Sequence, residues 1–417
     1  MKTPKTLMAL MILASLALNM ASCQTAFITA QGADLMEGVL PGNAEGKPAD
    51  EKFVSAMAQF SIELFKQGIK AKENSLVSPL SVMLALSMTA NGAKGWTLAQ
   101  MEKVLGGGIS LSELNKYLYA YVKGLPSEEK SKLNIANSIW FRDAETLSVR
   151  ADFLQKNADY YNANAYKSAF DAGTADEINA WVKSNTDGMI EKIVEQIPDD
   201  VMLYLINAVA FDAEWEEIYK EHGVYEGEFA DINGNRQKVD FMASTEHRYL
   251  DDGKATGFLK PYAGGGYSFA ALLPGEGVDI GEYIQSLTGG GFVETMKNAE
   301  SAVVYASMPK FGYEYGIEMN DALKALGMPD AFDEKKADFS KMASSSDGNI
   351  YIGSVVHKTF ISVTERGTRA GAATKVAMAA GGAPMEPKYV RLDRPFVFAI
   401  IDNATKLPVF IGTLMSV

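Results

Sequence analysis

Residues 364–387 read TERGTRAGAATKVAMAAGGAPMEP, and the fold assignment depends on this stretch. It is long, poor in bulky side chains and free of proline until Pro384. Small-residue tracts are often flexible linkers, which is the competing interpretation. Long loops inside a compact domain, however, are usually either functional or disordered.

The order of side chains in this stretch favours function. Every second residue from Thr368 can be buried, which gives the set Thr368, Ala370, Ala372, Thr374, Val376, Met378 and Ala380. The intervening set carries both charges, Arg369 and Lys375. Because successive side chains of a strand point to opposite faces, the loop can enter a sheet with both charges in water. We therefore expect a loop that can become a strand.

The beginning of this loop resembles the hinge of inhibitory serpins, in which an acidic residue, a glycine and a threonine precede a run of small residues. The hinge residues that the resemblance implies are Glu365, Gly367, Thr368, Ala370, Ala372 and Ala373. An inward charge near the hinge would stall insertion, and none is present in the inward set. The inhibitory type of serpin is therefore favoured over the non-inhibitory type.

Further motifs along the chain resemble the same family at matching spacing. They are NSLVSPLS at 74–81, GAKGWT at 92–97, INAWV at 178–182, LINAVAF at 205–211 with Trp215, and RPFVF at 394–398. The proline just inside a helix start after Ser78 is also a sound helix N-terminus signal on its own. The resemblance covers residues 51–417, the predicted serpin domain.

The resemblance implies an α+β serpin fold with about nine helices, three β-sheets and an exposed reactive-centre loop. It also implies a suicide-substrate inhibitor of serine proteases, with cysteine proteases as further targets. A protease cleaves the loop, the cut loop inserts into the central sheet as a new strand, and the acyl-enzyme is trapped. The alternative is a non-inhibitory binding lipoprotein on the same scaffold.

Two polar groups follow from the family motifs. Asn74, Ser78, Ser81, Asn207 and His357 match the cluster under the central sheet that is called the shutter. His357 lies in an apolar stretch, so we interpret it as a buried structural residue rather than a catalytic one. Trp215, Lys310 and Glu365 match the breach, the top of the sheet opening, where the last two are expected to form an ion pair.

The scissile bond is harder to assign from the sequence. Counting from the hinge glycine places it at Gly381, whereas counting back from the RPF motif gives Pro384. We expect cleavage near Ala380, Gly381 and Gly382, with Ala379, Ala383 and Met385 as alternatives. Small residues throughout this region indicate an elastase-like or subtilisin-like target.

The N-terminus predicts export and lipidation. Residues 1–23 have a positive start, a short apolar core and small residues before Cys23, as in a lipoprotein signal peptide with a lipobox. Cys23 is the only cysteine, which makes it the lipidation candidate and excludes intrachain disulfides. Residues 24–50 are predicted to be a flexible tether. We expect a bacterial cell-envelope protein held by this anchor, at the outer membrane and exposed at the surface or released as an extracellular protein.

Other function classes find little support. The chain has three histidines and no nucleophile elbow, phosphate-binding loop or metal-ligand motif, so neither an enzyme nor a cofactor or metal site is expected. A net charge of −13 argues against nucleic acid as a partner. We expect a monomer whose partners are proteases and, through its anchor, a membrane.

Overall fold

The computed structural model describes residues 32–198, 201–346, 348–368 and 386–417, and the fold is given for these residues. Gly32–Val417 forms one compact unit. Its central sheet has seven strands in the order β1-β5-β3-β6-β15-β14-β12. Their bounds are β1 Ala33–Asp34, β5 Asn164–Ser168, β3 Ser131–Arg142, β6 Leu203–Glu214, β15 Gly367–Thr368, β14 Ser354–Val363 and β12 Phe311–Glu318.

A second sheet has nine strands in the order β16-β11-β8-β9-β10-β17-β18-β2, with β7 beside β8. The bounds are β16 Lys388–Arg391, β11 Glu300–Pro309, β8 Arg236–Asp251, β9 Ala255–Pro261, β10 Tyr267–Pro274, β17 Phe396–Asp402, β18 Pro408–Leu414, β2 Ser75–Val77 and β7 Val224–Ala230. The third sheet is a small ribbon of β4 (Ser148–Val149) and β13 (Ala343–Ser344).

Helices α1 to α9 complete the described part of the chain. Their bounds are α1 Glu51–Gly68, α2 Pro79–Ala90, α3 Gly95–Gly106, α4 Leu111–Gly124, α5 Ala151–Tyr161, α6 Ala172–Asn185, α7 Ile280–Ser286, α8 Gly289–Lys297 and α9 Asn320–Leu326. Two short 3-10 turns are η1 Glu221–Gly223 and η2 Pro329–Phe332. The predicted α+β class, with about nine helices and three sheets, is confirmed.

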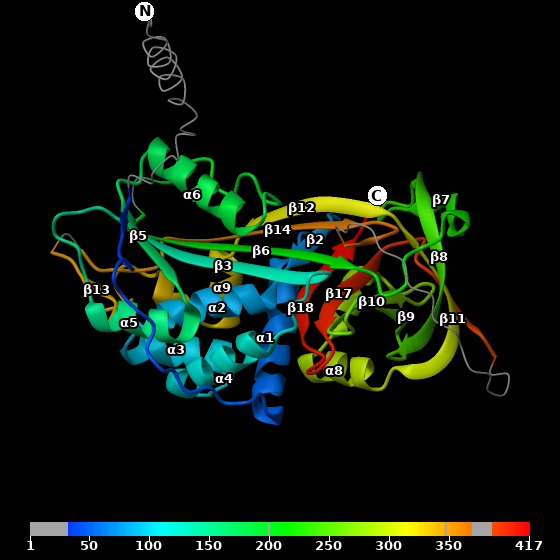
Figure 1. Cartoon of the computed structure of the whole chain (residues 1–417), viewed down its shortest axis with the longest axis horizontal. Helices are drawn as coiled ribbons and strands as arrows, with labels where there is room; N and C mark the ends of the chain where they lie inside the picture. The colour runs from blue at the N-terminus through cyan, green and yellow to red at the C-terminus, as the bar shows by residue number, and fades with distance from the viewer. Residues whose placement is uncertain (1–31, 199–200, 347, 369–385) are drawn as a thin grey trace, which may run out of the picture. The chain divides into compact units, whose positions relative to one another are not determined.

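Helices cover both faces of the seven-stranded sheet, α6 on one side and α2 on the other (Figure 1). Helix α2 is buried along its whole length, with Pro79 at its first position, as the sequence predicts. A smaller apolar cluster fills the space under α6, where Ile178 and Val182 meet Trp140 of β3. The main core lies on the α2 side and continues into the nine-stranded sheet. The central sheet is therefore buried on both faces, which explains why β6 reads as a nearly continuous apolar run.

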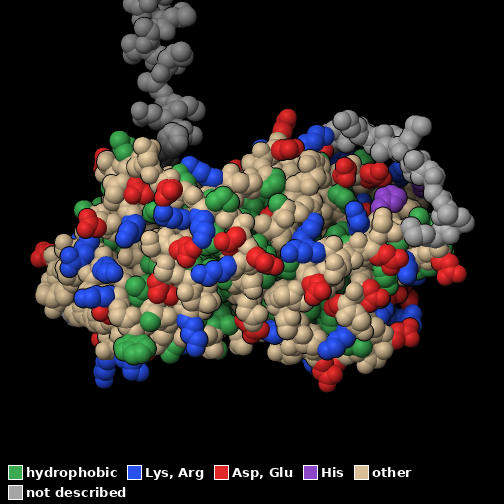
Figure 2. Space-filling view, turned by 90° about the horizontal axis from the view of Figure 1, so that it is seen from below, with side chains coloured by type: hydrophobic (Ala, Val, Ile, Leu, Met, Phe, Trp, Pro, Cys, Tyr) green, Lys and Arg blue, Asp and Glu red, His purple; other side chains and the backbone are tan. Residues whose placement is uncertain are grey.

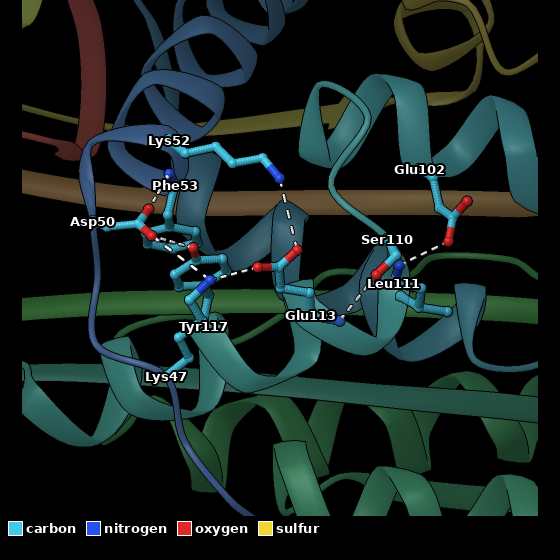
Figure 3. A network of polar contacts seen from close by, with 9 residues as sticks. All are labelled: Lys47, Asp50, Lys52, Phe53, Glu102, Ser110, Leu111, Glu113 and Tyr117. Carbon is cyan, nitrogen blue, oxygen red and sulfur yellow. Dashed lines mark hydrogen bonds and ion pairs between the residues drawn. The ribbon is translucent and has the colours of Figure 1, made fainter.

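The structure differs from the predicted flexible tether over residues 32–50, which lie against the compact unit. Leu35 N–H donates to Ala165 O at 2.9 Å, and β1 pairs with β5. Figure 3 shows Lys47 and Asp50 meeting Glu113 and Tyr117 of α4, and the bond to Glu113 raises the pKa of Lys47 above its ordinary value. Small residues allowed this close packing, and their composition alone resembled that of a linker.

The N-terminal predictions fall mostly outside the described residues. The predicted signal peptide 1–23, the lipidation candidate Cys23 and residues 24–31 all lie there. Among the helices that the structure describes, none combines the length and apolar character needed to cross a bilayer. Figure 2 shows acidic and basic side chains interspersed over the face it presents, rather than gathered by sign.

Candidate functional site

The candidate site is the place where β15 enters the central sheet. Gly367 and Thr368 lie between the end of β6 and the end of β14, with Thr368 opposite both Ala213 and Val363. Further along, β6 and β14 pair directly and in parallel, from Ser354 opposite Tyr204 to Thr359 opposite Val209. The sheet is therefore parted at one end and closed beyond it, and the first two residues of a new strand already occupy the parted end.

The Thr368 side chain is anchored at this fork. Thr368 is 1% exposed, and its Oγ1 lies 2.6 Å from the hydroxyl oxygen of Tyr262. The Tyr262 ring stacks on Trp215 with 4.5 Å between ring centroids. Burial raises the pKa of Tyr262 above its usual value, so the phenol keeps its proton for this contact. A buried hydroxyl pair thus holds the Thr368 side chain on the inner face of the sheet.

The turn that leads into β15 is held by Trp215 and the residues after it. The indole Nε1–H of Trp215 donates to Thr364 O at 2.9 Å, and its backbone N–H donates to Arg366 O at 2.9 Å. The Tyr219 N–H donates to Glu365 O at 2.9 Å. Three consecutive carbonyl groups of the hinge are therefore satisfied by one short segment after β6.

A charged group closes the same end of the sheet. Lys310 Nζ lies 3.2 Å from Glu365 Oε2 and 3.4 Å from Asp240 Oδ2. Partial burial opposes the charged form of Lys310, but its two carboxylate partners together raise its pKa. The Glu365 carboxyl has a lowered pKa, first from its own backbone N–H and then from Lys310. The predicted partners are thus brought together, and Lys310 also ties the hinge to β8.

A polar cluster lies below the fork, where β6 and β14 are still paired. His357 is fully buried; its Nε2 accepts from the Ser78 backbone N–H at 3.0 Å, and its Nδ1 is bonded to Asn207 Oδ1. The Asn207 amide nitrogen donates to Ser81 Oγ and Asn137 Oδ1. Because Nε2 must accept, this network assigns the neutral imidazole with its hydrogen on Nδ1.

The chemistry of this cluster is structural. Burial lowers the pKa of His357 to about 3, so the imidazole stays neutral near pH 7. Both ring nitrogens are already engaged, which leaves no lone pair to act as a base. Within the described ranges, no three His, Cys, Asp or Glu side chains are grouped to hold a metal ion.

Comparison with known proteins now decides the family. The family model described as "Serpin (serine protease inhibitor)" matches residues 55–417. The chain is a serpin.

Solved and curated serpins cover nearly all of this chain. The native-state crystal structure of tengpin, a thermophilic serpin, is 57% identical with a TM-score of 0.89, and the match covers 93% of this chain and 100% of tengpin. An uncharacterised serpin-like protein of Thermococcus kodakarensis is 31% identical over 89% of this chain and 87% of its own length. Leukocyte elastase inhibitor A of Rattus norvegicus is 29% identical over 88% and 100%.

The structure places two predicted shutter residues differently from the prediction. Asn74 contacts the C-terminal residues instead of the His357 cluster, since its Oδ1 accepts from Met415 N–H at 2.6 Å and its Nδ2 donates to Ser416 O at 2.8 Å. Ser78 does belong to the cluster, but through its backbone N–H rather than its hydroxyl. A motif match fixes a position in the chain, whereas the direction of the side chain depends on what packs around it.

Three residues of this serpin site were missed by the sequence reasoning. Asn137 interrupts the apolar residues Leu133, Ile135, Ile139 and Phe141 on one face of β3, and that irregularity was a readable signal for a hydrogen-bonded amide. Tyr262 had no such signal, because nothing in the residues around it distinguishes it from other tyrosines or indicates a contact with Thr368. Asp240 sits in an exposed alternating strand, and nothing in the sequence connects it with Lys310.

The remaining predicted loop positions lie outside the described residues. These are the hinge residues Ala370, Ala372 and Ala373, and the scissile candidates Ala379, Ala380, Gly381, Gly382, Ala383 and Met385. The described hinge residues Glu365, Gly367 and Thr368 all lie at the fork.

Proposed function

We propose that this serpin is a suicide-substrate inhibitor of serine proteases that traps the acyl-enzyme by inserting its cleaved loop between β6 and β14. The observation that carries the proposal is the position of β15. Thr368 is already paired on both sides at the parted end of the sheet, and Gly367 is paired with Glu214 of β6. A loop that is cut downstream of this point only has to continue a strand that has begun, so it avoids a separate nucleation step.

The strand register supports the proposal. Thr368 lies opposite Ala213 in β6 and Val363 in β14, and both pairings are antiparallel. Six residues further along the loop, continuation of this register would bring residue 374 opposite Asn207 and His357. Those two residues are themselves paired across β6 and β14, so the two registers agree. One inserted strand can therefore satisfy both neighbours without a bulge.

An inserted strand would have to pass between the shutter residues His357 and Asn207. Its insertion would separate β6 from β14 and so break the bond between these two residues. A threonine hydroxyl, as at residue 374, can both donate and accept, so it suits the gap between a ring N–H and an amide oxygen. Small inward residues elsewhere in the loop would pass α2 without steric conflict.

The target class follows from the loop sequence. Residues 379–385 read AAGGAPM, which offers small side chains to a protease pocket. Elastase-like and subtilisin-like serine proteases accept such residues, and a relative of this chain is named as a leukocyte elastase inhibitor. Cysteine proteases of similar pocket preference are a further class of target.

The test is formation of a covalent complex. Purified protein is incubated with pancreatic elastase and, separately, with subtilisin, and SDS-stable complex and residual activity are titrated. We expect a complex at close to one inhibitor per enzyme, and mass spectrometry of the released fragment identifies the bond among the candidates at 379–385. Turnover without any complex would overturn the proposal in favour of a non-inhibitory binding protein.

A hinge variant makes this test sharper. Thr368→Arg places a charge at a buried position with a tyrosine partner, so insertion should stall and the protein should become a substrate. We expect the number of inhibitor molecules consumed per trapped enzyme to rise at least about tenfold, a change equivalent to about 1.4 kcal/mol in partitioning. Arg366→Ala removes an exposed side chain two residues away and should leave trapping unchanged. Full trapping by Thr368→Arg would contradict insertion at this fork.

We also propose that the protein is a lipoprotein of a bacterial envelope, anchored through Cys23. The support is the sequence alone, with small residues before a single cysteine after a short apolar stretch. Metabolic labelling with palmitate in a bacterial host should mark the wild-type protein and spare Cys23→Ser. Equal labelling of both would exclude this anchor.

A further inference from the structure

The outer face of β7, β11 and β16 exposes a group of large hydrophobic side chains. Nine such side chains are exposed in the described part of the chain, and Tyr225, Val303, Tyr305 and Tyr389 are four of them. Tyr389 is the most open of the four, at 73% exposure. Strands β7, β8 and β11 lie together at one end of the unit (Figure 1). We call these four residues the tyrosine face.

Strand register explains why these side chains share one face. Tyr305 and Tyr389 are partners in the parallel pair β11–β16, and their ring centroids lie 5.4 Å apart. The alternate residues Val304 and Val390 are buried, which fixes the tyrosines on the outer side. The hydroxyl of Tyr225 lies 2.8 Å from Ser307 Oγ, two residues along β11 from Tyr305.

The composition of this face resembles an interface rather than ordinary surface. Single exposed hydrophobic residues are normal, but a contiguous group is not. Tyrosine supplies a large, rigid contact area at a small cost in conformational entropy, and tyrosine and arginine are enriched among the residues that dominate binding energy. Arg391 lies on the same face, in register with Ser307 and with its guanidinium 5.3 Å from the Phe241 ring centroid.

The chain itself indicates what covers the face. Strand β16 follows the loop directly, and Tyr389 comes eight residues after Gly381 in the sequence. Eight extended residues span at most roughly 28 Å. A protease domain of about 230 residues has a diameter of roughly 45 Å. An enzyme whose cleft is centred on the predicted scissile bond extends roughly 22 Å to each side, so its rim reaches Tyr389 where these eight residues are less than fully extended. Strand β16 lies on the leaving-group side of the cut.

We propose that the tyrosine face is a docking surface for the target protease, contacting the rim of its cleft on the leaving-group side. This inference rests on the proposed inhibitory function and deepens it. The face acts on the encounter between the two proteins, before the loop is cut. Its strands belong to the nine-stranded sheet, and none of them pairs with β6, β14 or β15, so we expect loop insertion to proceed as in the wild type when the face is changed.

The experiment compares the double variant Tyr305→Ala/Tyr389→Ala with Trp96→Ala. Trp96 is 80% exposed on α3 and serves as the matched control for losing an exposed aromatic ring. With pancreatic elastase and subtilisin as probes, we expect the second-order rate constant of inhibition to fall about tenfold for at least one enzyme in the double variant only. The stoichiometry of inhibition and the thermal midpoint should match the wild type.

A second measurement separates this inference from the proposed function. Binding is measured to elastase and subtilisin whose nucleophilic serine is replaced by alanine, so that neither acylation nor trapping can occur. We expect the dissociation constant to rise about tenfold in the double variant and to stay unchanged in Trp96→Ala. Unchanged binding and rate for both enzymes would overturn the docking surface even if covalent complexes form. If no covalent complex forms but the dissociation constant still rises tenfold in the double variant, only the proposed inhibitory function is overturned.

A second copy of the chain is the rival occupant of the tyrosine face. Sedimentation velocity at micromolar concentration distinguishes it. A wild-type dimer that the double variant converts to monomer would assign the face to self-association and overturn docking of the protease. A monomer in both proteins is the result expected here.

Discussion

His357 is the residue on which the closed state of the sheet depends most directly. Its two nitrogens bridge α2, through the Ser78 N–H, and β6, through Asn207. Both contacts require the neutral ring with one hydrogen, because a protonated imidazole would turn Nε2 into a donor facing another donor. The residue therefore joins β14 to α2 and β6 in the closed sheet, and it carries out no chemistry.

The first prediction concerns the pH dependence of stability. The pKa of His357 is lowered to about 3 in the folded protein, against about 6.5 in the unfolded chain. Its contribution is therefore complete above pH 6.5 and is lost as the pH falls toward 3, because only the unfolded chain takes up the proton. From this group alone, the free energy of unfolding should fall by about 2–3 kcal/mol between pH 7 and pH 4.5.

The measurement is urea unfolding at several pH values for wild type and His357→Gln. The variant should be less stable at pH 7 but should lose less on acidification, since the buried imidazole no longer takes up a proton on unfolding. His247→Gln, an exposed histidine, should keep the wild-type profile. Parallel profiles for wild type and His357→Gln would mean that the buried ring does not control this range.

A second prediction at the residue scale concerns Tyr262. Replacement by phenylalanine keeps the stacking on Trp215 but leaves the Thr368 hydroxyl without its buried partner. Such a loss usually costs about 1–2 kcal/mol. We expect a lower urea midpoint and faster amide exchange at Thr368. Tyr225→Phe removes a hydroxyl from an exposed contact and should change stability by less than about 0.5 kcal/mol. Equal effects of the two changes would argue against a buried anchor.

At the scale of elements, the segment before α1 is part of the folded unit. Strand β1 pairs with β5, and Gly42 N–H donates to Asp159 Oδ1 of α5 at 2.8 Å. Leu35, Met36 and Val39 pack against the main core. These contacts join the first residues of the unit to the edge of the central sheet and to the helices beneath it.

The third prediction removes this segment in two steps. Deletion of residues 24–46 takes away β1 and the contact with α5, and we expect the thermal midpoint to fall by roughly 2–6 °C. Deletion of residues 24–31 alone keeps β1 and the contact with α5, and we expect the midpoint to stay close to that of the wild type. Hydrogen exchange should locate the effect of the longer deletion in β5. A longer deletion with an unchanged midpoint would restore the original expectation of a tether.

Elements differ in how far their sequence could predict them. Helix α2 was readable because a proline after Ser78 and an unbroken apolar run left few alternatives. Strand β6 was readable from its nearly continuous apolar run, which is typical of a strand that is buried on both faces. Residues 32–50 were not, since their contacts are with α4, α5 and β5, and such long-range partners leave no local pattern.

At the scale of the molecule, the sequence predicted the fold well and the site partly. The resemblance to serpins implied the α+β arrangement and the ion pair between Lys310 and Glu365, and the structure contains both. It misplaced Asn74 and gave no sign that Gly367 and Thr368 already lie within the sheet. Whether the first loop residues pair within the sheet depends on the relative stability of β6 pairing with β15 and of β6 pairing with β14. The sequence of the loop alone does not determine that balance.

The fourth prediction follows from that balance. Cleavage in the loop should let a new strand form between β6 and β14, with ladder hydrogen bonds to both. A net gain of about 3–5 kcal/mol would raise the thermal midpoint by roughly 4–6 °C in a unit of this size. Calorimetry of intact and cleaved protein checks this, with cleaved Thr368→Arg as the control that should gain much less. No gain in the cleaved wild type would remove the basis for trapping.

The anchoring of Thr368 against Tyr262 also limits how the loop can be redesigned. Because that contact turns the Thr368 side chain inward, every second residue after Thr368 would also face inward in an inserted strand. An insertion of two residues ahead of the cleavage point would retain the pattern. An insertion of one residue directly after Thr368 would turn both Arg369 and Lys375 under the sheet, and one between Arg369 and Lys375 would turn Lys375. Any change in loop length that is made to retarget this serpin should therefore add or remove an even number of residues between Thr368 and the cleavage point.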